Sequence, residues 1–198
     1  ENATERLKDS SLVIVDGIQG EVLTDPEQET VAAYIQRRMD FEKERAALEK
    51  YMGLETLTKD GEKVQLFANI GTPEDASQVI AHDGEGIGLF RTEFLFMDRS
   101  TMPDENEQFE AYKKALLIMK NKTVIIRTLD IGGDKEITYL GLKKEENPFL
   151  GFRAVRYCLK NSEMFKTQLR ALLRASAYGD LQIMIPLVTG VDEVRQVK

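Results

Sequence analysis

The sequence contains very little of what disulfide-bonded, membrane-spanning or nucleic-acid-binding proteins require. Its one cysteine, Cys158, permits no internal disulfide and no cysteine-based metal cluster, and it is compatible with a reducing compartment, so we expect a cytoplasmic protein. No apolar run approaches the roughly 20 residues of a membrane span, and the amino-terminal ENATERLKDSS has no apolar signal region. The net charge of -7 argues against general nucleic-acid binding, because phosphate backbones require a basic surface. We therefore expect neither a membrane nor a nucleic acid as partner.

What the sequence does contain is a repeating plan. A chain of 198 residues with 42% hydrophobic side chains can bury a core. From Lys63 onward, apolar strand-like runs alternate with helical stretches. Strands are predicted at 64–70, 86–96, 123–131 and 181–188; helices are predicted after the cap at 72–75 and at 103–120, 147–160, 162–178 and 191–198. This alternation predicts an α/β fold with a parallel sheet, either an open doubly wound sheet or a (βα)8 barrel of which four units, the first half, are present.

The first quarter of the chain has a different pattern. Two short apolar runs flank Asp16-Gly17 and predict a β-hairpin, which is too small to be a domain by itself and should close a domain whose body lies upstream. Asp25 as N-cap and Pro26 at the first helical position then predict a helix to Gly53. Because its apolar stripe is narrow, we interpret this helix as a connector between domains.

Two apolar runs stop abruptly at an arginine. Arg91 and Arg127 lie 36 residues apart, about one βα unit, so each should stand at the carboxyl end of a neighbouring parallel strand. Ligands of α/β enzymes bind at this edge, and guanidinium groups form bidentate pairs with phosphate. The alternative is that each arginine only pairs with a nearby acid, Glu93 or Asp130. The occurrence of two arginines at equivalent positions favours a site for a phosphate-bearing ligand.

Further cations follow these strands. The loop 130–136, DIGGDKE, could bring backbone amides close to an oxyanion, and Lys135, beside Asp134, could add a charge; the alternative is an ordinary turn. Arg153, expected one turn into the helix that starts at 147–148, is a third candidate, with a surface residue as the alternative.

Other chemically suggestive residues are interpreted as structural. The glycines of 84–88 precede a strand instead of following one, so they indicate a tight turn and not a dinucleotide site. His82 has no acid or serine at a catalytic spacing and is expected at the surface. Cys158 is expected to be a small buried hydrophobe.

Three motifs carry a family resemblance. GEGIGLFRTEFLFMD (84–98), IIRTLDIGGDKE (125–136) and EENPFLGFRAVR (145–156) resemble, in order and spacing, the phosphoenolpyruvate-protein phosphotransferases, the Enzyme I family of the bacterial sugar phosphotransferase system. The resemblance implies that the phosphoryl group of phosphoenolpyruvate passes to an enzyme histidine and then to the phosphocarrier protein HPr. It also implies Mg²⁺ as cofactor, a homodimeric parent enzyme, and phosphate contacts from Arg91 and Arg127 with support from Arg153.

The resemblance further divides the chain into parts. Residues 1–24 would be the end of a phosphohistidine domain, 25–60 a linker helix, and 61–198 the first half of a phosphoenolpyruvate-binding (βα)8 barrel. The phosphorylated histidine, the metal ligands and the cysteine that protonates the enolpyruvate would lie outside this chain, so no catalytic residue and no metal ligand is assigned here. Two alternatives remain open: a piece of a pyruvate phosphate dikinase or phosphoenolpyruvate synthase, and a non-catalytic module that binds a phosphorylated metabolite.

Overall fold

The computed structural model describes residues 12–132 and 137–198, and these divide between two compact units, residues 1–54 and 55–198. Asp134 and Lys135 fall outside the described residues. The boundaries at 24 and 60 that the resemblance implies stay predictions. Among the described residues, none of the helices combines the length and the apolar composition needed to cross a membrane.

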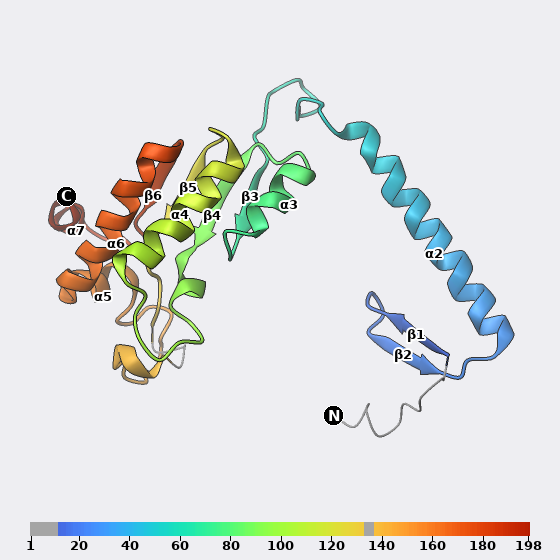
Figure 1. Ribbon diagram of the computed structural model, residues 1–198, viewed down its shortest axis with the longest axis horizontal. Coiled ribbons are helices and arrows are strands. Elements are labelled where there is room, and N and C mark those ends of the chain that lie inside the picture. Colours follow the sequence, from blue (N-terminus) through green and yellow to red (C-terminus); the bar gives the residue numbers. More distant parts are fainter. Residues whose placement is uncertain (1–11, 133–136) are drawn as a thin grey trace. The chain divides into compact units, whose positions relative to one another are not determined.

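The first unit contains the predicted hairpin. Strands β1 (Val13–Asp16) and β2 (Glu21–Thr24) pair antiparallel (Figure 1). The Asp16 carboxylate accepts hydrogen bonds from the backbone N–H groups of Ile18 and Gln19, both at 2.9 Å, which stabilises the turn. The prediction of a hairpin around Asp16-Gly17 is confirmed.

The helix after the hairpin starts later than predicted. Helix α2 spans Gln28–Leu48 with Glu27 as N-cap, and the 3-10 turn η1 (Glu49–Tyr51) follows it. Asp25 is not the cap, because its N–H donates to the Leu12 carbonyl at 2.9 Å beside the strand ends and its φ is +47°. None of the described residues of α2 is buried, so the apolar stripe expected to pack is exposed.

The second unit is built on a four-stranded sheet. Strands β3 (Phe67–Ile70), β4 (Gly86–Arg91), β5 (Val124–Arg127) and β6 (Leu181–Met184) are parallel and lie in sequence order (Figure 1). The prediction of an α/β fold with a parallel sheet is confirmed. Each strand is shorter than its apolar run; β4 in particular ends at Arg91, because residues 92–95 form a 3-10 turn, η2 (Thr92–Leu95).

Helices cover one face of this sheet. Helices α3 (Asp75–Ala81), α4 (Glu105–Met119) and α6 (Ser162–Ala175) form a layer against the strands (Figure 1). Their apolar positions meet those of the strands in a core that includes Phe90, Tyr112 and Leu172. Each fully buried side chain of this kind contributes about 1.5–3 kcal/mol to folding. The core therefore fixes the strands that end in Arg91 and Arg127.

A second apolar cluster lies under the segments that follow the strands. It contains Phe96, Leu129, Ile131, Cys158 and Phe165, together with residues of the 3-10 turn η3 (Thr138–Leu140) and of helix α5 (Ala154–Lys160). The chain ends with the 3-10 turn η4 (Ser176–Tyr178), strand β6 and helix α7 (Val191–Val197). The cluster anchors the loops at the carboxyl edge of the sheet.

One predicted helix is partly wrong. The pattern predicts a helix over 147–160, whereas α5 begins at Ala154 with Arg153 as N-cap. The preceding loop is closed on itself, because the Glu145 carboxylate accepts the Phe152 N–H at 3.0 Å. The Arg153 side chain also donates to the Pro148 carbonyl at 3.3 Å. These contacts replace the helical hydrogen bonds of 147–153.

Candidate functional site

The two arginines lie side by side at the carboxyl edge of the sheet. Arg91 is the last residue of β4 and Arg127 is the last residue of β5, and the two are directly paired in the parallel register. The hydroxyl of Thr92 donates to the Arg127 carbonyl at 2.8 Å and fixes the two strand ends to each other. The predicted geometry, with two guanidinium groups on neighbouring strand ends, is confirmed.

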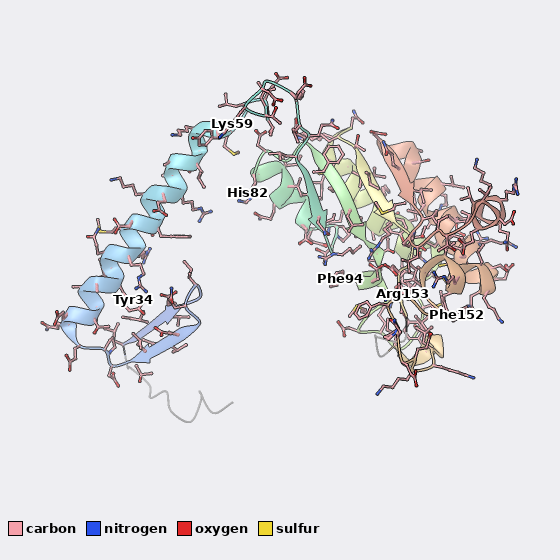
Figure 2. The ribbon with its side chains drawn as sticks, turned by 180° about the vertical axis from the view of Figure 1, so that it is seen from behind. Tyr34, Lys59, His82, Phe94, Phe152 and Arg153 are labelled. Atoms are coloured by element: carbon pink, nitrogen blue, oxygen red, sulfur yellow. The ribbon has the colours of Figure 1, made fainter. Side chains whose placement is uncertain are left out.

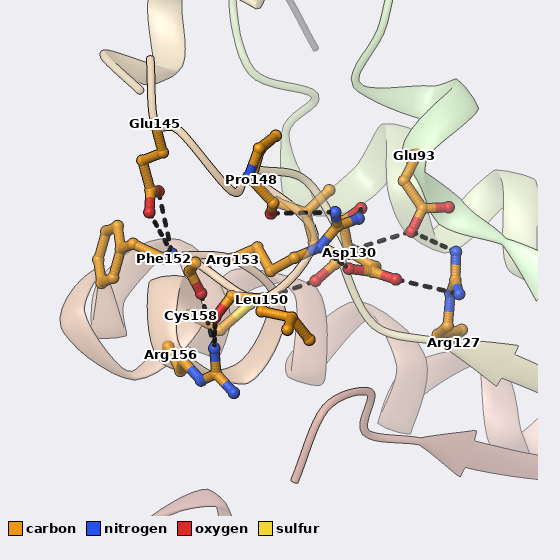
Figure 3. Close-up of polar contacts among 12 residues, drawn as sticks. Glu93, Arg127, Asp130, Glu145, Pro148, Leu150, Phe152, Arg153, Arg156 and Cys158 are labelled. Carbon is orange, nitrogen blue, oxygen red and sulfur yellow. Dashed lines mark hydrogen bonds and ion pairs between the residues drawn. The ribbon is translucent and has the colours of Figure 1, made fainter. Parts of the chain in front are cut away.

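Arg127 is held by two carboxylates (Figure 3). Its Nη2 donates to Glu93 Oε1 at 3.0 Å, and its Nη1 lies 3.1 Å from Asp130 Oδ2. The Glu93 side chain is only 1% exposed, and the same Oε1 accepts the Asp130 N–H at 2.9 Å. The acid pairing considered as an alternative for Arg127 is therefore present. It fixes the guanidinium at the strand end, where 21% of the side chain stays exposed.

Arg153 belongs to the same cluster. Its Nε donates to Asp130 Oδ1 at 2.9 Å, so Asp130 bridges Arg127 and Arg153 (Figure 3). Arg153 is 8% exposed, so the alternative of a surface residue is wrong. Arg153 is buried because it is the N-cap of α5, beside Asp130, instead of lying one turn into a helix.

Arg91 differs from the other two arginines. It makes no hydrogen bond or ion pair with any of the residues that the structure describes, and its Nε is buried without a partner. Its guanidinium carbon lies 5.0 Å from the centre of the Phe94 ring. The Nη donors of Arg91, unlike its Nε, are not among the buried atoms and are therefore available for a ligand.

The carboxylate of Asp75, the first residue of α3, lies in the electrostatic field of Arg91. The backbone N–H groups of Thr72 and Gly71, at the end of β3, donate to Asp75 Oδ2 at 2.9 and 3.0 Å. These two hydrogen bonds lower the pKa of Asp75 from its usual value, and the positive charge of Arg91 lowers it further. Asp75 is therefore ionised at neutral pH, and its carboxylate already accepts hydrogen bonds from the backbone.

The pairing within the cluster leaves one arginine for an anion. Among the described residues, Arg127 and Arg153 pair with the carboxylates of Glu93 and Asp130, whereas Arg91 makes no ion pair and Asp75 acts on it only through its electrostatic field. Arginine forms short, charge-assisted hydrogen bonds to phosphate oxygens, and it stays charged at every relevant pH. The cluster can therefore attract and orient a dianionic group, with Arg91 as its unpaired cation.

A buried polar network supports the site from below, and the sequence analysis missed it. Gln168 of α6 is fully buried; its Oε1 accepts the Leu129 N–H at 3.0 Å, and its Nε2 donates to Thr92 Oγ1 at 3.2 Å. Nε2 also lies 3.2 Å from the hydroxyl of Tyr112, which donates to Gln108 at 3.1 Å. Gln168 thus connects the segments that carry Glu93 and Asp130. The only sign of this network in the sequence is a glutamine on the otherwise apolar face of α6.

The described residues do not form a metal centre. Across 12–132 and 137–198, no group of three or more His, Cys, Asp or Glu side chains is placed to hold a metal ion. Glu93 and Asp130 are both engaged by arginines. Mg²⁺ therefore does not fit the acids that the structure describes.

The remaining sequence candidates are structural, as predicted. His82 is the C-cap of α3, lies at the surface (Figure 2), and its Nδ1 is 2.8 Å from the Gln78 carbonyl. Cys158 is fully buried, where desolvation and then the charge of Asp130 raise the pKa of its thiol to about 12. The glycines at 84–88 enter a strand instead of following one, as predicted, but only Gly84 lies in the turn, because Gly86 and Gly88 are part of β4.

Known proteins resemble this chain over nearly its whole length. Residues 45–198 match the family model described as PEP-utilising enzyme, PEP-binding domain. The chain is 54% identical to a phosphoenolpyruvate-protein phosphotransferase of Priestia megaterium over 98% of this chain, and 52% identical to one of Bacillus subtilis over 99%. It spans 34% of the length of each relative. The family resemblance inferred from the three motifs is confirmed: the chain belongs to the PEP-utilising enzymes and matches their PEP-binding domain.

Proposed function

We propose that this chain supplies part of the phosphoenolpyruvate site of a phosphoenolpyruvate-protein phosphotransferase. The whole enzyme would transfer the phosphoryl group of phosphoenolpyruvate to one of its own histidines and then to HPr. The observation that carries this proposal is the register pairing of Arg91 with Arg127 at the carboxyl edge of the sheet, where Arg91 makes no ion pair with any described residue. The names of the relatives favour this proposal over a dikinase, a synthase or a non-catalytic module.

The roles proposed for the arginines follow from their surroundings. Arg127 is fixed by Glu93 and Asp130, so it would offer a preorganised donor to the phosphoryl oxygens. Arg91, which has no ion-pair partner among the described residues, would gain its main partner when the ligand binds. Arg153 would act through Asp130, holding that carboxylate in place. Arginines aimed at a moving phosphoryl group neutralise charge that develops in the transition state.

The finer architecture is part of the proposal. We assign 61–198 to the first half of a (βα)8 barrel, 25–60 to a linker helix, and 1–24 to the end of a phosphohistidine domain. Four parallel strands in sequence order fit a half barrel. Asn69, Gln182 and Met184 are exposed on the strands, which fits a sheet face that further barrel strands would enclose. A cytoplasmic homodimer that uses Mg²⁺, with ligands from outside this chain, completes the assignment. Lys135 and Asp134 are assigned as supporting residues.

The test is phosphoryl transfer from phosphoenolpyruvate to HPr by the full-length enzyme. Arg91→Ala is the cleanest variant, because it breaks no hydrogen bond or ion pair among the described residues. We expect a loss of two or more powers of ten in turnover, as is typical when a transition-state contact is removed. Arg127→Lys keeps a charge opposite the buried Glu93 but loses the guanidinium fork, and we expect a similar loss.

The matched control is Arg38→Ala. Arg38 lies on α2, its side chain is exposed, and it pairs only with Glu42 among the described residues. Its removal should leave turnover unchanged. Near-normal turnover of the Arg91→Ala and Arg127→Lys enzymes would contradict the proposed roles.

A further inference from the structure

The surroundings of Arg91 contain a second feature with a functional consequence. Phe94 is 47% exposed, although it lies in the segment that follows β4 directly, and Figure 2 shows it in the same part of the second unit as Arg153. A large apolar side chain so exposed contributes little to the core. Its ring instead lies against the guanidinium of Arg91, 5.0 Å from ring centre to guanidinium carbon.

Local backbone structure dictates this contact. Arg91 is the N-cap of the 3-10 turn η2, and Phe94 follows three residues later. Side chains at positions i and i+3 of a 3-10 turn lie above one another. The turn therefore places the Phe94 ring over the arginine that ends the strand, and turns Glu93 inward to Arg127.

A glycine on the neighbouring strand end leaves space for the ring. Gly71 follows β3, and a Cβ added there would lie 3.0 Å from both Cδ2 and Cε2 of Phe94. This is closer than ordinary van der Waals contact, so any larger residue would displace the ring. Gly71 has no positive φ that would require glycine, which leaves the approach of the ring as the physical reason for a residue without Cβ.

The three arginines are thus fixed by different means. Carboxylates hold Arg127 and Arg153, whereas Arg91 lies beside the Phe94 ring and has no carboxylate partner among the described residues. Arg153 lies beside a ring as well, that of Phe149 at 5.8 Å, but it is also paired with Asp130. An aromatic ring orients a guanidinium without using its hydrogen-bond donors or neutralising its charge. Both remain available to an anion.

We infer that Phe94 is a positioning residue that orients Arg91 for the phosphoryl group by stacking, and that Gly71 leaves the space which keeps its ring in place. The inference rests on the proposed function, because it assigns the ligand of Arg91 as phosphate. Phe94 touches Arg91 and need not touch the ligand. Its effect should therefore be confined to affinity for the phosphoryl group and should depend on the aromatic character of the side chain.

The experiment measures dissociation constants of the full-length enzyme for phosphoenolpyruvate and for inorganic phosphate. Phe94→Leu should raise the two dissociation constants by the same factor, about two- to fivefold, as expected for loss of an exposed cation–π contact. The Phe94→Tyr and Phe94→Trp enzymes should bind both ligands as tightly as the unchanged enzyme does. Phe41→Leu, the same substitution at an exposed position of α2, is the matched control and should change neither constant.

Gly71→Ala tests the second half of the inference. As a single substitution it should weaken the binding of both ligands. Added to Phe94→Leu it should have no further effect, since the two residues act through one ring. Additive losses would overturn the assigned role of Gly71.

The outcomes separate this inference from the proposed function. If Arg91→Ala binds both ligands normally, both are wrong. If Arg91→Ala weakens binding but Phe94→Leu does not, only the role of Phe94 is wrong. A loss confined to phosphoenolpyruvate would also overturn the inference, because it would place Phe94 against the enolpyruvate part of the ligand. Equal affinities of the Phe94→Leu and Phe94→Tyr enzymes for the two ligands would also overturn the inference.

Discussion

Replacement of Gln168 by leucine should destabilise the second unit strongly, although no charge and little volume is lost. Gln168 is fully buried, and its side chain makes contacts to Leu129, Thr92 and Tyr112. Its loss would leave the buried Leu129 N–H without the acceptor that Gln168 provides, and a backbone donor cannot be removed by a compensating substitution.

The magnitude follows from the individual contacts. An orphaned buried donor costs about 1–3 kcal/mol, and each lost neutral hydrogen bond about 0.5–1.5 kcal/mol. The Thr92 and Tyr112 hydroxyls still donate to Arg127 and Gln108, so they lose only part of their bonding. We expect Gln168→Leu to lower the free energy of unfolding by roughly 2–5 kcal/mol, a large part of the 5–15 kcal/mol typical of a domain.

The assay is urea unfolding followed by circular dichroism, with amide hydrogen exchange at Leu129 as the local measurement. The exposed Gln196 provides a matched control, and Gln196→Leu should stay within about 0.5 kcal/mol of the unchanged chain. A loss below 1 kcal/mol for Gln168→Leu, with unchanged exchange at Leu129, would refute the reasoning, because it would mean that Leu129 finds another acceptor.

Two further predictions concern single side chains. Cys158 should not react with a disulfide reagent at pH 8 until urea unfolds the chain, since burial raises the pKa of its thiol to about 12. Because the folded pKa lies above the unfolded one, the contribution of Cys158 to stability should be full below about pH 8.5 and be lost as the pH rises towards 12; rapid labelling of the folded chain would contradict this. Asp104 caps α4 and accepts the Glu107 N–H at 2.8 Å, so Asp104→Ala should cost about 1 kcal/mol in urea unfolding and Asp104→Ser much less. Equal stability of these two variants would show that the cap is not needed.

The sequence was sufficient for the order of elements and for the position of the arginine pair. Apolar runs separated by helical stretches predict parallel strands, and a strand that ends in arginine must present that side chain at the carboxyl edge. The register of Arg91 against Arg127 follows from this pattern.

Where the prediction failed, contacts distant in sequence decided the structure. The run 86–96 reads as one strand, but Thr92 bonds to the Arg127 carbonyl and the chain turns there. Residues 147–153 have a helical pattern, yet Glu145 holds the Phe152 N–H outside any helix. Burial of Arg153 likewise depends on Asp130, 23 residues away. Local propensity contains no information on such partners.

The most direct test of the central claim is a structure of the full-length enzyme with phosphoenolpyruvate bound. We predict that the phosphoryl oxygens lie within hydrogen-bonding distance of the guanidinium groups of Arg91 and Arg127, with Arg153 still paired to Asp130. Phosphoenolpyruvate bound elsewhere, with Arg91 remaining free of any anion, would contradict the account.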